Sequence, residues 1–140
     1  MSDSVSSILN TDGEGPLTIE YNGKKYTAGL ITQKVKSDFE KRMERKALDS
    51  IFSIKDRLEM VEFREAMSSV TRDIASGVYS FGSELSIEAL STPAGAIAFA
   101  SILFACSEAE VQSLMIAEKD RFEVVMEMVR EKSFPNEKKV

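Results

Sequence analysis

The feature that most constrains the fold is an uncharged stretch in the second half of the chain, TPAGAIAFASILFACSE, residues 92–108. Thr92 before Pro93 is typical of a helix start, because proline lacks the donor that would be unsatisfied in the first turn. The stretch predicts a helix from Pro93 to about Cys106 that is apolar on all sides. Its uncharged span holds too few residues for the ~20 of a membrane span. We therefore expect a central core helix wrapped by others, with Cys106 as a buried small hydrophobe.

The composition is that of an ordinary soluble globular chain. Of 140 residues, 43% are hydrophobic and 29% are charged, which predicts one domain over residues 16–134 with a real core. Residues 1–15 are rich in Ser, Gly and Asp and predict a flexible arm without the features of a secretory signal, while residues 135–140 form a charged tail. The net charge of −5 argues against general nucleic-acid binding.

Missing residue types exclude most forms of catalysis. The sequence has no histidine, which removes the usual triads, His-based acid–base catalysis and His-containing metal sites. It has one cysteine and neither a GxGxxG nor a GxxxxGK[ST] pattern. A magnesium site built from carboxylates alone stays open, although the acidic residues sit mostly singly on amphipathic helices. We expect no enzyme activity, cofactor, metal or small-molecule substrate.

The segment PLTIEYNGKKYTAGLIT, residues 16–32, predicts a β-hairpin. Asn22-Gly23 is the preferred pair for a type I′ turn, because both residues tolerate a positive φ. The expected pairs are Tyr21 with Lys24, Glu20 with Lys25, and Ile19 with Tyr26. One face is then mainly apolar and the other carries an opposite-charge pair, which supports the register.

Thr32 is expected to cap a helix that runs to about Phe52. Its apolar stripe has a spacing of four residues: Val35, Phe39, Met43, Ala47 and Ile51. Its other face carries the bases Lys34, Lys36, Lys41, Arg42, Arg45 and Lys46, interleaved with acids. Such interleaving usually marks a solvated face, and a surface for an acidic partner is the alternative.

Four more helices follow. Ser53 with Asp56 resembles a capping box for a helix to about Ser76, with Met60, Phe63, Met67, Val70 and Ile74 on one face and Gly77 as its stop. A short helix over about 83–90 precedes the central one. Ser107 with Glu110 predicts a capping box for a helix through about Ala117, and Asp120 is expected to cap a last helix to about Lys132, with Phe122, Val125, Met126 and Val129 on its apolar side. The predicted fold is mainly α: an N-terminal β-hairpin followed by a compact bundle of five or six short helices around an apolar central helix.

Candidate partner-binding residues lie on the first and last helices. Met128 lies off the apolar stripe of its own helix beside Val124, where an exposed apolar pair would suit a partner, although scattered apolar surface residues are normal. The candidates are Lys34, Lys41, Arg42, Arg45, Val124 and Met128. The acidic segment over 108–131 could meet the basic first helix within one chain or between subunits, so a homo-oligomer is left open.

The order of features also carries a resemblance. The strand pair LTIEYNGKKYTAGLIT is followed by the charged helix FEKRMERKALDSI, then by DIASGVYSFGSELSIEALSTPAGAIAFASILF and SEAEVQSLM. Over roughly residues 17–132 this order resembles the tail assembly chaperone group of tailed double-stranded DNA bacteriophages. The resemblance implies a non-enzymatic protein of the host cytoplasm that binds the tape-measure protein during tail assembly and keeps its hydrophobic helices in solution. It carries over no catalytic or binding position.

Three other functions compete with this one. A structural virion subunit, such as a minor head, connector or tail component, would assemble through the hairpin and the arm. A small carboxylate–metal enzyme is disfavoured by the missing histidine, and a DNA-binding regulator by the acidity. The expected partner is therefore a phage structural or tape-measure protein, with no nucleic acid and no membrane.

Overall fold

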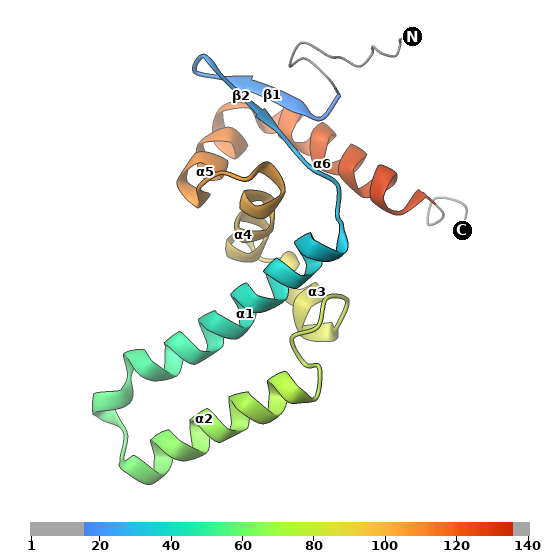
Figure 1. Cartoon of the computed structure of the whole chain (residues 1–140). Helices are drawn as coiled ribbons and strands as arrows, with labels where there is room; N and C mark the ends of the chain where they lie inside the picture. The colour runs from blue at the N-terminus through green and yellow to red at the C-terminus, as the bar shows by residue number, and fades with distance from the viewer. Residues whose placement is uncertain (1–15, 136–140) are drawn as a thin grey trace. The chain divides into compact units, whose positions relative to one another are not determined.

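The computed structural model describes residues 16–135, and Figure 1 shows the order of its elements. An N-terminal two-stranded antiparallel hairpin precedes six α-helices within these residues, so the predicted mainly-α class is confirmed. The predicted arm over 1–15 and residues 136–140 of the predicted tail lie outside the described part. Residues 16–35 with 97–135 form one compact unit, and residues 36–96 form another. One domain over 16–134 stays a prediction.

The hairpin has the predicted turn and register. It consists of β1, Thr18–Tyr21, and β2, Lys24–Thr27, and all three predicted pairs are present. Asn22 and Gly23 have φ values of 56° and 78°, as a type I′ turn requires. Ile19 and Tyr26 are buried, so the apolar face predicted for the hairpin is the face that packs inward.

The core of the first unit lies among three helices. These are α4, Pro93–Phe104, which belongs to this unit from Ile97 onward, α5, Glu108–Ala117, and α6, Lys119–Ser133. They bury Ala98, Phe99, Ala100, Leu103, Phe104, Val111, Leu114, Phe122, Val125 and Val129. Phe104 stacks on Phe122 with ring centroids 5.9 Å apart. The expectation that the uncharged stretch fills a core is thus confirmed for residues 98–104.

The end of α4 differs from the prediction. The helix ends at Phe104 because Ala105 takes a φ of 54°, a left-handed conformation that cannot continue an α-helix. Cys106 therefore lies beyond the helix and is only partly buried. The expectation that Cys106 is a buried small hydrophobe at the end of this helix is therefore wrong.

The hairpin and the segment after it are tied to α4 and α6 by backbone carbonyls. Arg121 on α6 donates from Nη2 to the carbonyl oxygens of Thr18, at 3.0 Å, and Pro16, at 3.2 Å. The Gly29 amide donates to the Leu103 carbonyl at 2.9 Å. An isolated hairpin is marginal in water, so these contacts and the buried face of the hairpin hold it in place.

The second unit contains most of α1 and two further helices. Its elements are α1, Gln33–Ser53, the 3₁₀ turn η1, Lys55–Arg57, α2, Met60–Ala75, and α3, Glu84–Leu90. The Thr32 hydroxyl accepts from the Val35 amide at 3.2 Å, which confirms the predicted cap of α1. Gly77 has a φ of 87° after α2, as expected for a helix stop.

The predicted start of α2 is wrong. Ser53 is the last residue of α1, and its hydroxyl donates to the Ser50 carbonyl at 2.8 Å. The capping box is formed instead by Glu59 and Glu62, where each side chain accepts from the backbone amide of the other residue. The usual capping box begins with Ser or Thr and not with Glu. For this reason the sequence pattern favoured Ser53 over Glu59.

The predicted start of α6 is also wrong, by two residues. The N-cap is Glu118, and no side chain caps this end of the helix. Asp120 lies inside the first turn, where its carboxylate is close to the positive end of the helix dipole. Its position there still favours the helix, but through charge and not through a capping hydrogen bond.

A tight corner joins α3 to α4. The Thr92 hydroxyl donates to the Ala89 carbonyl at 2.7 Å and accepts from the Gly95 amide at 3.1 Å. These bonds bring Gly95 so close to α3 that a Cβ atom placed on it would lie 1.8 Å from the Ala89 oxygen. Position 95 therefore requires glycine, because the corner leaves no room for a Cβ atom.

We expect Gly95→Ala to lower the free energy of unfolding by about 2 kcal/mol or more, because the backbone of α3 must move away from the new methyl group. In an uncrowded helix the same change would stabilise by about 1 kcal/mol, so the sign of the effect is diagnostic. Gly29→Ala is the matched control, since its Cβ would meet no atom closer than 3.7 Å. Urea denaturation followed by circular dichroism measures both variants. A stabilised Gly95→Ala protein would contradict the corner as described.

Candidate partner-binding site

Helix α6 has one buried face and one exposed face. Phe122, Val125 and Val129 are buried, at the spacing of three and four residues that keeps side chains on one side of a helix. The side chains between them are turned outward by the same period. Val124 is 48% exposed, and Met128 is partly buried. This face therefore carries one exposed and one partly buried apolar side chain, one turn apart, so the expected exposure is found for Val124 and only in part for Met128.

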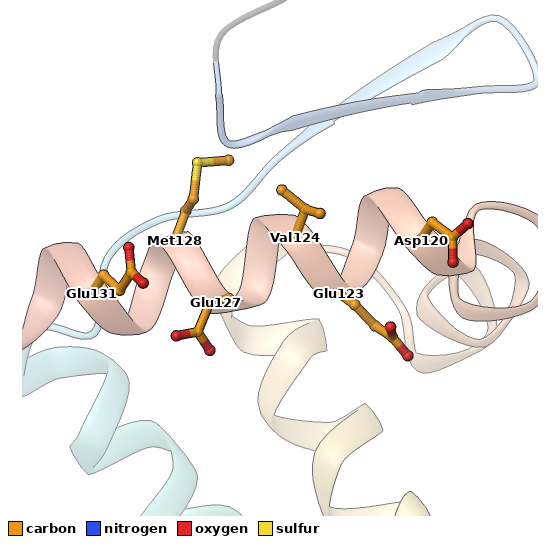
Figure 2. A pocket seen from close by; sticks show the side chains of 6 residues that line it. All are labelled: Asp120, Glu123, Val124, Glu127, Met128 and Glu131. Atoms are coloured by element: carbon orange, nitrogen blue, oxygen red, sulfur yellow. The ribbon is translucent and has the colours of Figure 1, made fainter. Parts of the chain in front are cut away.

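A shallow, wide-open stretch of surface, which we call the α6 hollow, runs along this face and is lined by α6 alone. Two rows of residues with a spacing of four form its lining. One row is Asp120, Val124 and Met128, and the other is Glu123, Glu127 and Glu131. Figure 2 shows Val124 and Met128 projecting from one side of the helix and Glu123 and Glu127 from the other. The hollow thus pairs an apolar surface with a line of carboxylates.

This arrangement can bind an apolar side chain and a cation at the same time. Val124 and Met128 offer a surface that is poorly solvated, and the methionine side chain adapts its shape easily. Glu127 makes a close ion pair with Arg130 on the same helix, which reduces the negative charge on one member of the row. From Asp120 to Glu131 the lining spans roughly 16 Å, or about three helical turns.

The structure brings together two of the six residues singled out from the sequence. Val124 and Met128 meet in the hollow. Lys34, Lys41, Arg42 and Arg45 are exposed on α1 and do not line it. The surplus of acids over residues 108–131 was predicted from the sequence, but the carboxylate row was not. The spacing of four residues between Glu123, Glu127 and Glu131 was the signal that could have revealed it.

A second, smaller hollow lies where the hairpin meets α5. It has a volume of about 310 Å³ and is lined by Tyr21, Asn22, Lys24, Tyr26, Glu110 and Ser113. The Glu110 carboxylate accepts from Lys24 Nζ at 2.9 Å and from the Tyr26 hydroxyl at 3.0 Å. It also accepts from the Ser107 amide at 3.0 Å, which completes the capping box predicted for α5. The carboxylate is therefore occupied by structural contacts.

Those contacts set the ionisation of Glu110. The pKa of its carboxyl falls from an ordinary value of 4.5 to about 2, first because the Ser107 amide donates to it and then because Lys24 and Tyr26 do. Cys106 lies nearby, and burial raises the pKa of its thiol. A thiol with a raised pKa holds less of the nucleophilic thiolate at neutral pH, so this cysteine is poorly suited to attack a substrate.

Residues 16–135 show neither a metal-binding cluster nor a membrane-spanning helix. In this range no group of three or more Cys, Asp or Glu side chains is placed to hold a metal ion. Likewise, no single helix of the described part is long and apolar enough to cross a membrane. The sharply bent pair α3 and α4 meets the criteria of length and composition together, and α4 is also the buried core helix of the first unit.

Comparison with known proteins gives no relative from which a function could be transferred. No protein-family model, no curated protein and no solved structure matches this chain.

The stability of the protein should depend on pH through Glu110. Because its pKa is lower in the folded chain, the ionised carboxylate stabilises the fold fully above about pH 4.5, and this contribution is lost as the pH falls toward 2. We expect Glu110→Gln to unfold at a lower urea concentration than the parent protein at about pH 6, and the difference to shrink at about pH 3. Glu88→Gln, at an exposed position of α3, is the control. A pH-independent difference would contradict the assigned role of the Glu110 charge.

Proposed function

We propose that this protein is a non-enzymatic bacteriophage morphogenesis factor, tail assembly chaperone-like, which binds a helical tail (tape-measure) protein during assembly. The observation that carries the proposal is the hollow on α6, where the apolar pair Val124 and Met128 lies beside a row of carboxylates. The order of elements along the sequence supports the phage setting. The hollow supports a protein ligand.

The chemistry of the hollow favours a cationic amphipathic helix as its ligand. An amphipathic helix places apolar side chains four residues apart, which matches the spacing of Val124 and Met128. Lys or Arg side chains flanking that stripe would lie toward the carboxylate row of α6. The carboxylates would steer such a ligand toward the hollow and reject an acidic one, because charges act mainly on association rate and specificity.

The hollow also suits transient binding. Its apolar part consists of two side chains on a single open helix face, which is small compared with a permanent interface. Transient contacts with many similar segments are what a chaperone of a long helical client needs. Incorporation into the particle as a structural subunit is the competing role, and it would require a larger interface than this one.

The helix-binding role predicts selective capture of a cationic amphipathic peptide. We expect a helical peptide with leucines four residues apart and flanking lysines to bind the full chain. The same peptide with glutamates in place of the lysines should bind at least ~tenfold more weakly. Fluorescence anisotropy of labelled peptides measures both affinities, and binding of the lysine peptide should weaken as salt is added.

A matched pair of variants assigns this binding to the hollow. Val124→Lys should weaken capture of the lysine peptide at least ~tenfold, because it removes apolar surface and places a cation among the carboxylates. Ile116→Lys changes the net charge equally at an apolar position of α5 that is 79% exposed and outside the hollow, and it should change the affinity less than ~twofold. Equal effects of the two variants would reduce the binding to general charge attraction and refute the site.

The phage setting requires its own measurement. Peptide mass spectrometry should detect this chain in the lysate of infected cells and not in purified mature particles, because a transient chaperone leaves before the tail is complete. Stoichiometric presence in the particles would instead establish a structural subunit of the virion. Absence from both samples would refute the phage assignment while leaving the peptide-binding result intact.

A further inference from the structure

The end of the α1–α2 helical hairpin carries an exposed apolar patch. It is formed by Phe52 at the end of α1, Ile54 in the turn, and Met60 and Val61 at the start of α2. Their exposed fractions are 52%, 38%, 63% and 63%. These four make up nearly half of the nine large hydrophobic residues that are exposed in the described part, within a segment of ten residues. Apolar clusters of this kind with polar surroundings mark contact sites for other proteins.

Helix α2, whose first two residues belong to the patch, is not covered by other described elements deeply enough to bury any of its residues. Of the described helices with ten or more residues, α2 separates its apolar and polar faces most strongly, yet none of its residues is buried. In its unit, four of 61 residues are buried, against 14 of the 59 described residues of the other unit. Helices in proteins gain most of their stability from packing of an apolar face, so α2 is incomplete without a further layer.

Local contacts do not close the patch. Phe52 packs edge-on against Phe63 with ring centroids 5.6 Å apart, and the Lys55 ammonium lies 5.1 Å from the centre of the Phe63 ring. These contacts give the turn a defined shape. They leave more than half of the Met60 and Val61 surfaces exposed.

The charges beside the patch form two groups of opposite sign. The turn over 55–57 has two bases, Lys55 and Arg57, with one acid, whereas the segment over 59–65 has three acids, Glu59, Glu62 and Glu65, with one base. A partner of a single charge sign would be attracted by one group and repelled by the other. A surface with the same two groups in the opposite order would match both of them.

We propose that this patch binds the same patch of a second copy of the chain, around a two-fold axis near Val61. In a two-fold contact both copies use the same surface. If one residue of the first copy meets a second residue of the other copy, the reverse contact is also made. An antiparallel crossing of α2 near Val61 directs the basic turn of one copy, which contains Arg57, toward the acidic first turns of α2 in the other, which contain Glu65. The apolar side chains of the two copies then cover each other. This surface is separate from the hollow on α6, and the inference does not depend on the proposed function.

Sedimentation velocity of the full chain at increasing concentration tests the proposal. The patch is small, so we expect a reversible dimer with a dissociation constant on the order of 10–100 µM. Met60→Lys combined with Val61→Lys should raise this constant at least ~tenfold, whereas the control Ile116→Lys should leave it within ~twofold. A parent protein that is monomeric at about 1 mM, or a dimer equally strong in both variants, overturns the proposal.

Two charge reversals test the two-fold arrangement itself. Arg57→Glu and Glu65→Arg should each weaken self-association, because each sets like charges against each other across the contact. An equimolar mixture of the two variants should associate again, because the reversed residue of one meets the reversed residue of the other. A mixture that stays monomeric overturns the arrangement. Circular dichroism checks that each variant keeps its helices. If the Met60→Lys, Val61→Lys variant unfolds, Val61→Ser is measured instead, and it should also raise the dissociation constant at least ~tenfold.

Discussion

The placement of the hairpin on α5 and α6 is the constraint from which the rest of the first unit follows. Arg121 binds the backbone of the segment that leads into and begins β1, and Glu110 binds two side chains of β2. Both anchors are charged groups bound by several partners, which hold their geometry better than single neutral hydrogen bonds do. With Arg121 directed at the hairpin and Val125 and Val129 in the core, the helical period leaves Val124 outside. The exposure of Val124 is thus a consequence of how the hairpin is held.

The second unit has a small core, with Phe39, Met43 and Tyr79 buried, and depends more on local interactions than the first unit does. Capping bonds define the start of α2 and α3, the Thr92 hydroxyl defines the corner at Gly95, and one aromatic pair joins the end of α1 to α2. Such contacts specify where helices begin and turn, and each contributes on the order of 1 kcal/mol. They do not remove apolar area from water as a core does. The patch over residues 52–61 is where the most apolar surface of this unit stays exposed to water.

Sequence patterns predicted the features that depend on neighbouring residues. The turn at Asn22-Gly23 set the register of the hairpin, and Thr32, Ser107 and Gly77 marked helix ends correctly. The start of α2 failed because Ser53 fits the preferred capping pattern better than Glu59, while the structure uses Glu59. The incomplete burial of α2 could not be predicted, since an apolar stripe identifies a face and not what covers it. Helical spacing likewise placed Val124 and Met128 off the buried face of α6. It did not predict that they lie beside a row of carboxylates.

The two proposed interaction surfaces would differ in the kind of specificity that they provide. The α6 hollow has one dominant charge sign and a small apolar area, so we expect it to discriminate between classes of helix and not between individual sequences. The patch over 52–61 has both charge signs in a fixed order, which selects a partner of matching order. A pair of copies joined through that patch would present two α6 hollows to one client. The second contact would then gain from effective concentration whenever the client spans both hollows, so two weak sites would hold a long helical protein more tightly than either site could alone.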